Sequence, residues 1–158
     1  MSSKKILSRS ALARILARRG RKSVVFTNGC FDLLHVGHVR LFRSAKKLGD
    51  VLVVAVNSDH SLRKLKGSGR PLVDQKSRAE VLAALDVIDY VVIFDEDTPL
   101  ETIRALKPDV LMKGGDYELS QIVGRDSVKK VVLFPLVKGI STTRIIQKIL
   151  SAYGGKSR

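Results

Sequence analysis

Cysteine, tryptophan and long apolar runs are scarce or absent in this chain of 158 residues. Its single cysteine, Cys30, has no partner for an internal disulfide, which excludes a disulfide-stapled secreted scaffold. No group of Cys and His has the spacing of a structural zinc site. No segment approaches transmembrane length, and arginines interrupt the apolar residues near the N-terminus. We therefore expect a soluble cytoplasmic protein without a membrane partner.

Acidic residues are absent from the first 22 positions, where eight of the 29 lysines and arginines lie. With 15 Asp and Glu in the whole chain, the formal net charge is +14, and more than half of this excess lies in that segment. A basic end can bind nucleic acid. However, the chain has no Trp, few other aromatic residues for base stacking, and no pattern of a nucleic-acid-binding module. Nucleic-acid binding is therefore the less favoured interpretation.

The length suits one domain with a proper core. Residues 8–19 have the pattern of an amphipathic helix with an apolar stripe of Leu12, Ile15 and Leu16, and we expect its arginines to face solvent. We predict three parts: a basic N-terminal helix packed on the domain (1–21), the domain proper (22–152) and a C-terminal tail (153–158).

Apolar, β-branched runs alternate with segments of helical pattern along the domain. This alternation predicts an α/β fold with a doubly wound parallel sheet, whose ligands bind beyond the carboxyl ends of the strands. Asp74 is placed to cap one helix, and Pro99 to occupy the first position of another. The predicted strands are 23–27, 51–56, 90–94, 110–112 and 131–134, and the predicted helices include 39–48, 62–66, 75–85, 99–107 and 142–152, with a short helical piece after residue 118.

The most informative stretch is residues 24–38, where a buried strand leads through a polar loop into a helix. Its loop carries His35 and His38, with Gly37 between them at the expected first turn of the helix. A helix start presents free N–H groups and a positive dipole end, and the missing side chain at Gly37 allows an anion to approach. The arrangement indicates phosphate chemistry. Metal ligation, or simple packing of the two histidines, is the alternative.

A second group of polar residues opens the last predicted helix. Ser141, Thr142 and Thr143 can present hydroxyl and backbone N–H groups to phosphate oxygens. Taken alone, they are a good helix cap. A P-loop of the form G-x-x-x-x-G-K-[ST] is absent from the sequence.

Together, the runs GCFDLLHVGH and GISTTRI resemble the HxGH nucleotidyltransferase superfamily, whose members have a Rossmann-like fold. The similarity covers residues 22–150 and is greatest to the D-glycero-β-D-manno-heptose 1-phosphate adenylyltransferases, the ADP-heptose synthases. Segments 57–59, 94–99 and 113–117 look like those enzymes. Leu136 and Val137 stand where cytidylyltransferases carry an Arg-Thr pair, and Ile140 stands where the heptose enzymes often have Cys.

The resemblance implies roles for individual residues. His35 and His38 would donate hydrogen bonds to the triphosphate as catalytic residues, and Lys64 and Lys66 would reach across the phosphates from a mobile segment, although such lysines are often only solvated. The nucleotide-binding residues would be Thr27, Gly29, Cys30, Phe31, Gly37, Gly114, Ile140, Ser141, Thr142 and Thr143. The substrate-binding residues would be Asn57, Asp59, Arg78 and Asp116.

Several of these residues also have structural interpretations. Arg78 can equally make a structural ion pair, and Asp116 can simply fix its loop. We expect Asp32 to hold the loop in shape, because a carboxylate facing a triphosphate opposes its binding. The acidic run 95–97 is expected to form a solvated loop and helix start rather than a metal site.

The resemblance implies that the chain moves AMP from ATP to D-glycero-β-D-manno-heptose 1-phosphate. The products are ADP-heptose, for lipopolysaccharide core biosynthesis, and pyrophosphate. Mg²⁺ would accompany ATP, held mainly by the triphosphate. A homodimer is expected, with a separate heptose kinase upstream, since bifunctional relatives join this domain to a sugar kinase. The enzymatic alternative is CTP-dependent transfer to glycerol 3-phosphate or a related phosphate, and the alternative of another class is a nucleic-acid-binding module without turnover.

Overall fold

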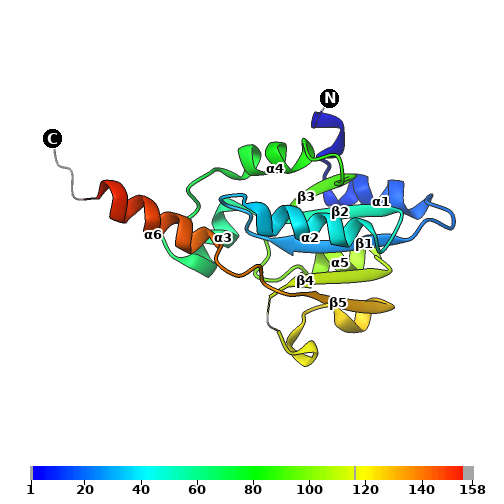
Figure 1. Ribbon diagram of the computed structural model, residues 1–158. Helices are drawn as coiled ribbons and strands as arrows, with labels where there is room; N and C mark the ends of the chain where they lie inside the picture. Colours follow the sequence, from blue (N-terminus) through cyan, green and yellow to red (C-terminus); the bar gives the residue numbers. More distant parts are fainter. Residues whose placement is uncertain (1, 116, 155–158) are drawn as a thin grey trace.

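Five parallel strands form one sheet in the computed structural model, which describes residues 2–115 and 117–154. Their order is β3-β2-β1-β4-β5, so the first strand along the chain lies in the centre, between β2 and β4 (Figure 1). The predicted α/β class with a Rossmann-like parallel sheet is confirmed. The strands are β1 (Val24–Gly29), β2 (Val51–Asn57), β3 (Tyr90–Phe94), β4 (Val110–Gly114) and β5 (Lys130–Phe134).

The helices follow the predicted pattern, with small differences at their ends. Asp74 caps α4 through the backbone N–H groups of Lys76 and Ser77, as expected. Pro99 is the residue before α5 rather than its first helical residue. The helices are α1 (Arg9–Ala17), α2 (Val36–Lys46), α3 (Asp59–Lys66), α4 (Gln75–Ala83), α5 (Leu100–Leu106) and α6 (Thr142–Tyr153), with 3-10 turns η1 (Ser2–Lys5), η2 (Leu119–Gln121) and η3 (Arg125–Ser127).

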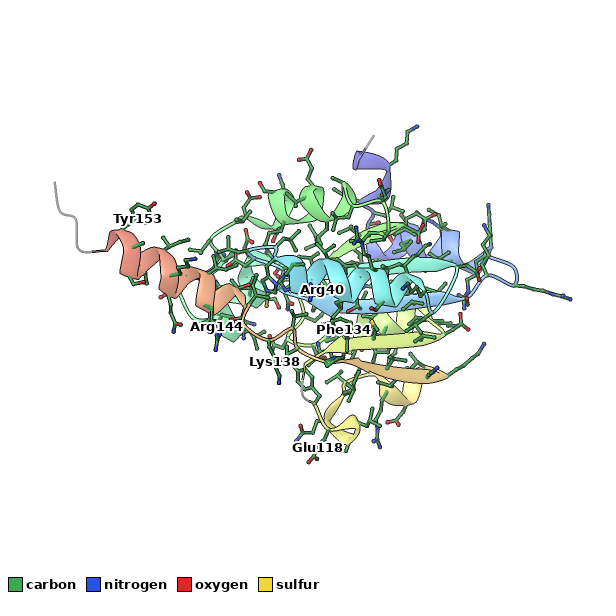
Figure 2. The ribbon with its side chains drawn as sticks, in the orientation of Figure 1. Arg40, Glu118, Phe134, Lys138, Arg144 and Tyr153 are labelled. Atoms are coloured by element: carbon green, nitrogen blue, oxygen red, sulfur yellow. The ribbon has the colours of Figure 1, made fainter. Side chains whose placement is uncertain are left out.

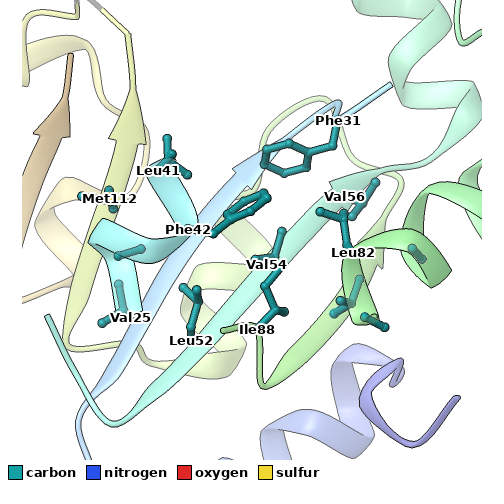
Figure 3. Packing of buried hydrophobic residues seen from close by; sticks show 14 of the residues in the cluster. Val25, Phe31, Leu41, Phe42, Leu52, Val54, Val56, Leu82, Ile88 and Met112 are labelled. Carbon is teal, nitrogen blue, oxygen red and sulfur yellow. The ribbon is translucent and has the colours of Figure 1, made fainter. Parts of the chain in front are cut away.

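The core lies on both faces of the sheet because side chains alternate along each strand. On β2, Leu52 and Val54 pack with α2 and α4, whereas Val53 and Ala55 pack with α1 and α5. Figure 3 shows the first of these clusters, with Phe42 of α2 over the strands. This two-sided burial is what a doubly wound sheet requires. It leaves the carboxyl ends of the strands as the edge where a ligand can bind.

The last helix, α6, differs from the others because none of its residues is buried. It extends away from the sheet in Figure 1. Tyr153, at its far end in Figure 2, is 72% exposed. Thr142, at the start of α6, donates a hydrogen bond to the carbonyl oxygen of Leu33, which attaches the first turn to the loop after β1. No helix in the part of the chain that the structure describes is long and apolar enough to cross a bilayer.

The N-terminal segment is more closely integrated into the fold than its composition indicates. Leu12 and Leu16 of α1 are buried in the core, but Ile15, predicted to share their stripe, is 43% exposed. Ile6 forms a parallel bridge to Val91 of β3, a pairing that the sequence pattern did not predict. The apolar stripe of α1 is thus narrower than expected. The backbone bridge at Ile6 further attaches the N-terminal segment to the sheet.

The prediction that the arginines of residues 8–19 face solvent fits Arg14 and Arg18, which are exposed, but not Arg9 and Arg19, which form ion pairs. Lys5 donates hydrogen bonds to the carbonyl oxygens of Leu85 and Ile88. Arg9 forms an ion pair with Glu96, in the acidic run 95–97, and Arg19 with Asp109, near the start of β4. Part of the basic character of this segment is therefore used within the fold, because acidic side chains and carbonyl groups far along the chain lie beside it.

Candidate active site

A cavity of about 580 Å³ opens at the carboxyl ends of the strands, a volume typical of small-molecule sites. Residues from β1, β2 and β4 line it, together with the first turns of α2 and α6. Most of the residues singled out from the sequence meet here, although they come from positions more than a hundred residues apart. Those that line the cavity are Thr27, Gly29, Cys30, Phe31, His35, Gly37, His38, Asn57, Lys66, Gly114, Ile140, Ser141, Thr142 and Thr143.

Three of the singled-out residues do not line this cavity: Lys64, Asp59 and Arg78. Asp116 lies outside the described residues. The ammonium group of Lys64 lies 3.4 Å from the carboxylate of Asp97 on the exposed side of α3. Of the two predicted phosphate lysines, Lys66 is therefore the one that faces the cavity.

Arg78 occupies the structural role that was its alternative interpretation. Its side chain is fully buried and forms an ion pair with Asp59 at 2.7 Å. Its other N–H groups donate to three backbone carbonyls, those of Cys30, Asn57 and Val73. Every part of this guanidinium group thus contacts protein, and it fastens the ends of β1 and β2 to the segments that follow them.

His35 caps the first turn of α2. Its Nδ1 accepts a hydrogen bond of 3.2 Å from the backbone N–H of Gly37, so the neutral ring carries its proton on Nε2. The N–H of Gly37 is therefore occupied by His35, although it lies at the start of a helix. The glycine is nevertheless required, since a Cβ at position 37 would lie 2.9 Å from the His35 ring.

His38 lies directly behind His35, with the two rings stacked at a centroid distance of 3.8 Å. Phe31 packs edge-on against His38 at 5.3 Å. Burial, and secondly the neighbouring His35, lower the pKa of His38 to about 4, and burial also lowers the pKa of His35. Both imidazoles are therefore neutral at pH 7. A neutral imidazole carries one N–H, which it can donate to a phosphate oxygen.

The loop between β1 and α2 holds a backbone conformation that is rare for residues other than glycine. Phe31 has φ of 47°, and its ring occupies the space beside Gly29, where a Cβ would lie 2.9 Å from the ring. In this position the Phe31 ring makes its edge-to-face contact with the ring of His38. Such a conformation costs free energy and is found where the surrounding structure fixes a functional loop.

Asp32 holds this loop in shape, as predicted. Its carboxylate is fully buried and accepts hydrogen bonds from the backbone N–H groups of Leu72 and Val73 and from Nε of Arg70. Burial alone would raise the pKa of Asp32, but these donors together lower it below its ordinary value. The carboxylate is therefore ionised and fully occupied, and it ties the loop after β1 to the segment between α3 and α4.

The first turn of α6 is attached to the same loop. Thr142 Oγ1 donates a hydrogen bond of 3.3 Å to the carbonyl oxygen of Leu33, 109 positions earlier in the chain. Ser141 caps α6 by accepting from the backbone N–H of Arg144, as predicted. The starts of α2 and α6 consequently border one cavity, and each helix start favours an anion.

Lys113 is a cavity residue that the sequence interpretation missed. It is the penultimate residue of β4. Its ammonium group donates to Asn28 Oδ1 at 3.2 Å and lies 5.7 Å from the centroid of the Tyr117 ring. Burial lowers the pKa of Lys113. The available signal was its position at the end of an apolar strand, just before two glycines.

Gly114 lines the cavity and also lies against α2. A Cβ at this position would lie 2.5 Å from Leu41 of α2. Packing of α2 on β4 therefore uses this space. An apolar end of the cavity, which the sequence did not identify, lies around Ile122, Phe134 and Leu136.

Metal ligands do not gather in the described ranges 2–115 and 117–154: no three His, Cys, Asp or Glu side chains there are placed to hold an ion. Besides the occupied Asp32, the carboxylate that lines the cavity is Asp97. The donors around the cavity are mainly imidazole, ammonium, hydroxyl and backbone N–H groups, which suit phosphate oxygens.

The family model described as cytidylyltransferase-like matches residues 26–148. The chain is 57% identical to the bifunctional protein HldE of Citrifermentans bemidjiense and 58% identical to that of Geobacter metallireducens, covering 96% and 97% of this chain but 32% of each relative. It thus spans about a third of the length of these relatives. A solved lipopolysaccharide core biosynthesis protein from Thermoplasma volcanium has a TM-score of 0.62 at 28% identity, covering 75% of this chain and 99% of that one. The chain therefore belongs to the cytidylyltransferase-like family and is a nucleotidyltransferase.

Proposed function

We propose that this nucleotidyltransferase moves AMP from ATP to D-glycero-β-D-manno-heptose 1-phosphate, releasing ADP-heptose and pyrophosphate. The observation that carries the proposal is the hydrogen bond from Thr142 to the carbonyl of Leu33. It attaches the start of α6 to the loop that leads into α2, whose first turn holds His35 and His38, so that donors from both helix starts surround one cavity. A triphosphate needs donors on several sides, and this cavity offers them.

In the proposed reaction, a phosphate oxygen of the sugar phosphate attacks the α-phosphorus of ATP, and the bond from that phosphorus to the bridging oxygen of pyrophosphate breaks. Catalysis then consists of alignment and stabilisation of negative charge. Nε2 of His35 and an N–H of His38 donate to phosphate oxygens, and Lys66 adds positive charge. Mg²⁺, which we propose is held mainly by the triphosphate, neutralises further charge when it is bound.

The choice of ATP and of a heptose phosphate rests on the relatives and on the apolar end of the cavity. The similar Thermoplasma protein is described as acting in lipopolysaccharide core biosynthesis, and the bifunctional HldE proteins are the highly identical relatives. Leu136 and Val137 line the cavity at the position where cytidylyltransferases have an Arg-Thr pair. These side chains offer no hydrogen bonds to a cytosine, which supports adenine instead.

We also propose that a heptose kinase supplies the sugar 1-phosphate and that the chain acts as a homodimer. Both follow from the resemblance to ADP-heptose synthases. Light scattering coupled to gel filtration measures the second directly, and a mass of one chain, about 17.4 kDa, would contradict it.

Pyrophosphate release tests the proposed function. The protein is incubated with ATP or CTP and with a panel of phosphates that includes heptose 1-phosphate, other sugar 1-phosphates and glycerol 3-phosphate. We expect release with ATP and heptose 1-phosphate. Release with CTP alone would favour the cytidylyltransferase alternative. No release with any pair, together with salt-dependent DNA binding, would favour the nucleic-acid-binding alternative.

A further inference from the structure

We propose that Arg70, held in place by Asp32, binds the phosphate group of the acceptor, the sugar 1-phosphate. This inference rests on the proposed function and assigns a residue to its second substrate. Arg70 belongs to the segment between α3 and α4, and its side chain lines the cavity. Nothing in the sequence pattern set it apart from the other basic residues.

The buried carboxylate of Asp32 fixes the direction of the Arg70 side chain. Nε of Arg70 donates to Asp32 Oδ2 at 2.5 Å, and the backbone N–H groups of Leu72 and Val73 donate to the same carboxylate at 2.9–3.0 Å. Two backbone contacts next to the arginine hold the segment down. The guanidinium group is therefore oriented before any ligand arrives, which reduces the entropy lost on binding.

The outer part of this guanidinium group remains available. Asp32 occupies Nε, whereas the two terminal amino groups have no hydrogen-bond partner among residues 2–115 and 117–154. The Arg70 side chain is only 18% exposed, so most of it is already removed from water. A planar guanidinium with two free amino groups is suited to two parallel hydrogen bonds with a phosphate.

Other positive charges lie close to the same part of the cavity. Burial raises the pKa of the Cys30 thiol, while the nearby Lys66, Arg70 and Lys113, which also line the cavity, oppose that rise. Asp32 is saturated with donors, and Asp97, the other carboxylate of the lining, is paired with Lys64. An anion near Cys30 therefore meets several cations.

The sheet order favours the acceptor over the triphosphate as the partner of Arg70. Transfer in line requires the acceptor phosphate and the leaving pyrophosphate on opposite sides of the α-phosphorus. The apolar end of the cavity, around Phe134 and Leu136, follows β5 on one side of the central β1. Arg70 comes from the segment after α3, which follows β2 on the other side of β1. A nucleotide base at the apolar end thus leaves the Arg70 side for the acceptor.

Steady-state kinetics of Arg70→Gln and Arg70→Lys test the assignment. We expect Arg70→Gln to raise KM for the sugar 1-phosphate about 10- to 100-fold, since charge-assisted hydrogen bonds are lost. KM for ATP should change less than about twofold. Arg70→Lys should restore little, because an ammonium group lacks the planar fork. Arg63→Gln, on the exposed part of α3 and outside the cavity lining, is the control with the same change of charge.

Asp32→Asn tests the positioning role separately. We expect KM for the sugar phosphate to rise as much as in Arg70→Gln, and kcat to change by a smaller factor than KM does. Thermal unfolding will verify that each variant is folded. An unchanged KM for the acceptor in folded Arg70→Gln would refute the assignment. A rise in KM for ATP instead would place Arg70 on the triphosphate and refute it equally.

Calorimetric titration of heptose 1-phosphate, in the presence of a non-hydrolysable ATP analogue, separates this inference from the proposed function. One outcome is that wild-type protein binds the sugar phosphate and Arg70→Gln does not, while the separate assay with ATP shows no pyrophosphate release. In that case the proposed function fails and the subsite stands. If both proteins bind the sugar phosphate equally well, the subsite is refuted, whatever the activity.

Discussion

His35 and His38 reach the cavity as neutral hydrogen-bond donors, and burial is the reason. Charging a buried imidazole is costly, so the pKa of His38 falls to about 4 and that of His35 is lowered as well. The contact from the Gly37 N–H to His35 Nδ1 then fixes which nitrogen of His35 donates. A phosphate in this cavity meets oriented N–H dipoles, supplemented by the charges of nearby lysines.

Replacement of His38 tests its proposed role in the reaction. We predict that His38→Ala lowers kcat by about 100- to 1,000-fold, as expected when one preorganised donor to a transition state is lost. His60→Ala provides the control, because His60 is exposed and does not line the cavity. Circular dichroism will show whether the variants are folded. A folded His38→Ala protein with near-normal kcat would remove this residue from the mechanism.

Gly37→Ala tests whether the orientation of His35 matters. A Cβ at this position would lie 2.9 Å from the His35 ring, so the ring must move. We predict a roughly 10- to 100-fold fall in kcat, with unchanged or slightly higher stability, because alanine favours a helix more than glycine does. In Gly69→Ala, whose new Cβ would have no neighbour within 4 Å, kcat should stay the same. Equal kcat in both variants would contradict the prediction.

For single residues, the sequence predicted the members of contiguous motifs. It missed residues whose positions depend on contacts with distant parts of the chain. The histidines and Ser141–Thr143 were identified because their motifs place them at helix starts. The burial of Arg78 depends on carbonyls from three separate segments, and the position of Arg70 depends on Asp32. Neither arrangement has a local pattern to reveal it.

The elements of the sheet were predictable because their apolar runs are continuous and flanked by polar turns. The structure extends β1 to Gly29 and β4 to Gly114, since these polar and glycine-containing ends still pair with β2 and β5. Glycine has a low β-strand propensity, so strands predicted from sequence end before these glycines. The two extensions carry Asn28 and Lys113, which contact each other at the cavity.

Helix α1 offers a direct test of its attachment to the core. Leu12 is fully buried, whereas Ile15 on the same helix is 43% exposed. We predict that Leu12→Ala lowers the free energy of unfolding by about 2–5 kcal/mol and that Ile15→Ala lowers it by less than about 1 kcal/mol. Urea unfolding measures both. Similar small losses in the two variants would mean that α1 is only loosely attached.

At the scale of the whole molecule, the excess of positive charge is distributed differently from what composition suggests. Arg9 and Arg19 neutralise Glu96 and Asp109, which come from distant parts of the chain. Lys66, Arg70 and Lys113 line the cavity. Some of the basic residues thus form ion pairs that hold distant parts of the chain together, and others surround the candidate site. Composition alone could not separate these uses because it holds no information on spatial neighbours.

The stability of the folded protein should depend on pH through His38. Its pKa is about 4 in the folded protein against an ordinary value of 6.5, so the unfolded chain binds a proton first as pH falls. The stabilising contribution is therefore fully present above pH 6.5 and is lost between pH 6.5 and 4. It amounts to at most about 3 kcal/mol. Urea unfolding at several pH values should show a shallower pH dependence for His38→Gln. Parallel curves for the two proteins would contradict this prediction.

The account depends most on the claim that His35, His38 and the first turn of α6 surround the same triphosphate. A crystal structure of the protein with α,β-methylene ATP and Mg²⁺ tests it directly. We predict triphosphate density within hydrogen-bond distance of both histidines and of Ser141–Thr143, with the base toward Phe134. Triphosphate density at any other place on the molecule would contradict the account.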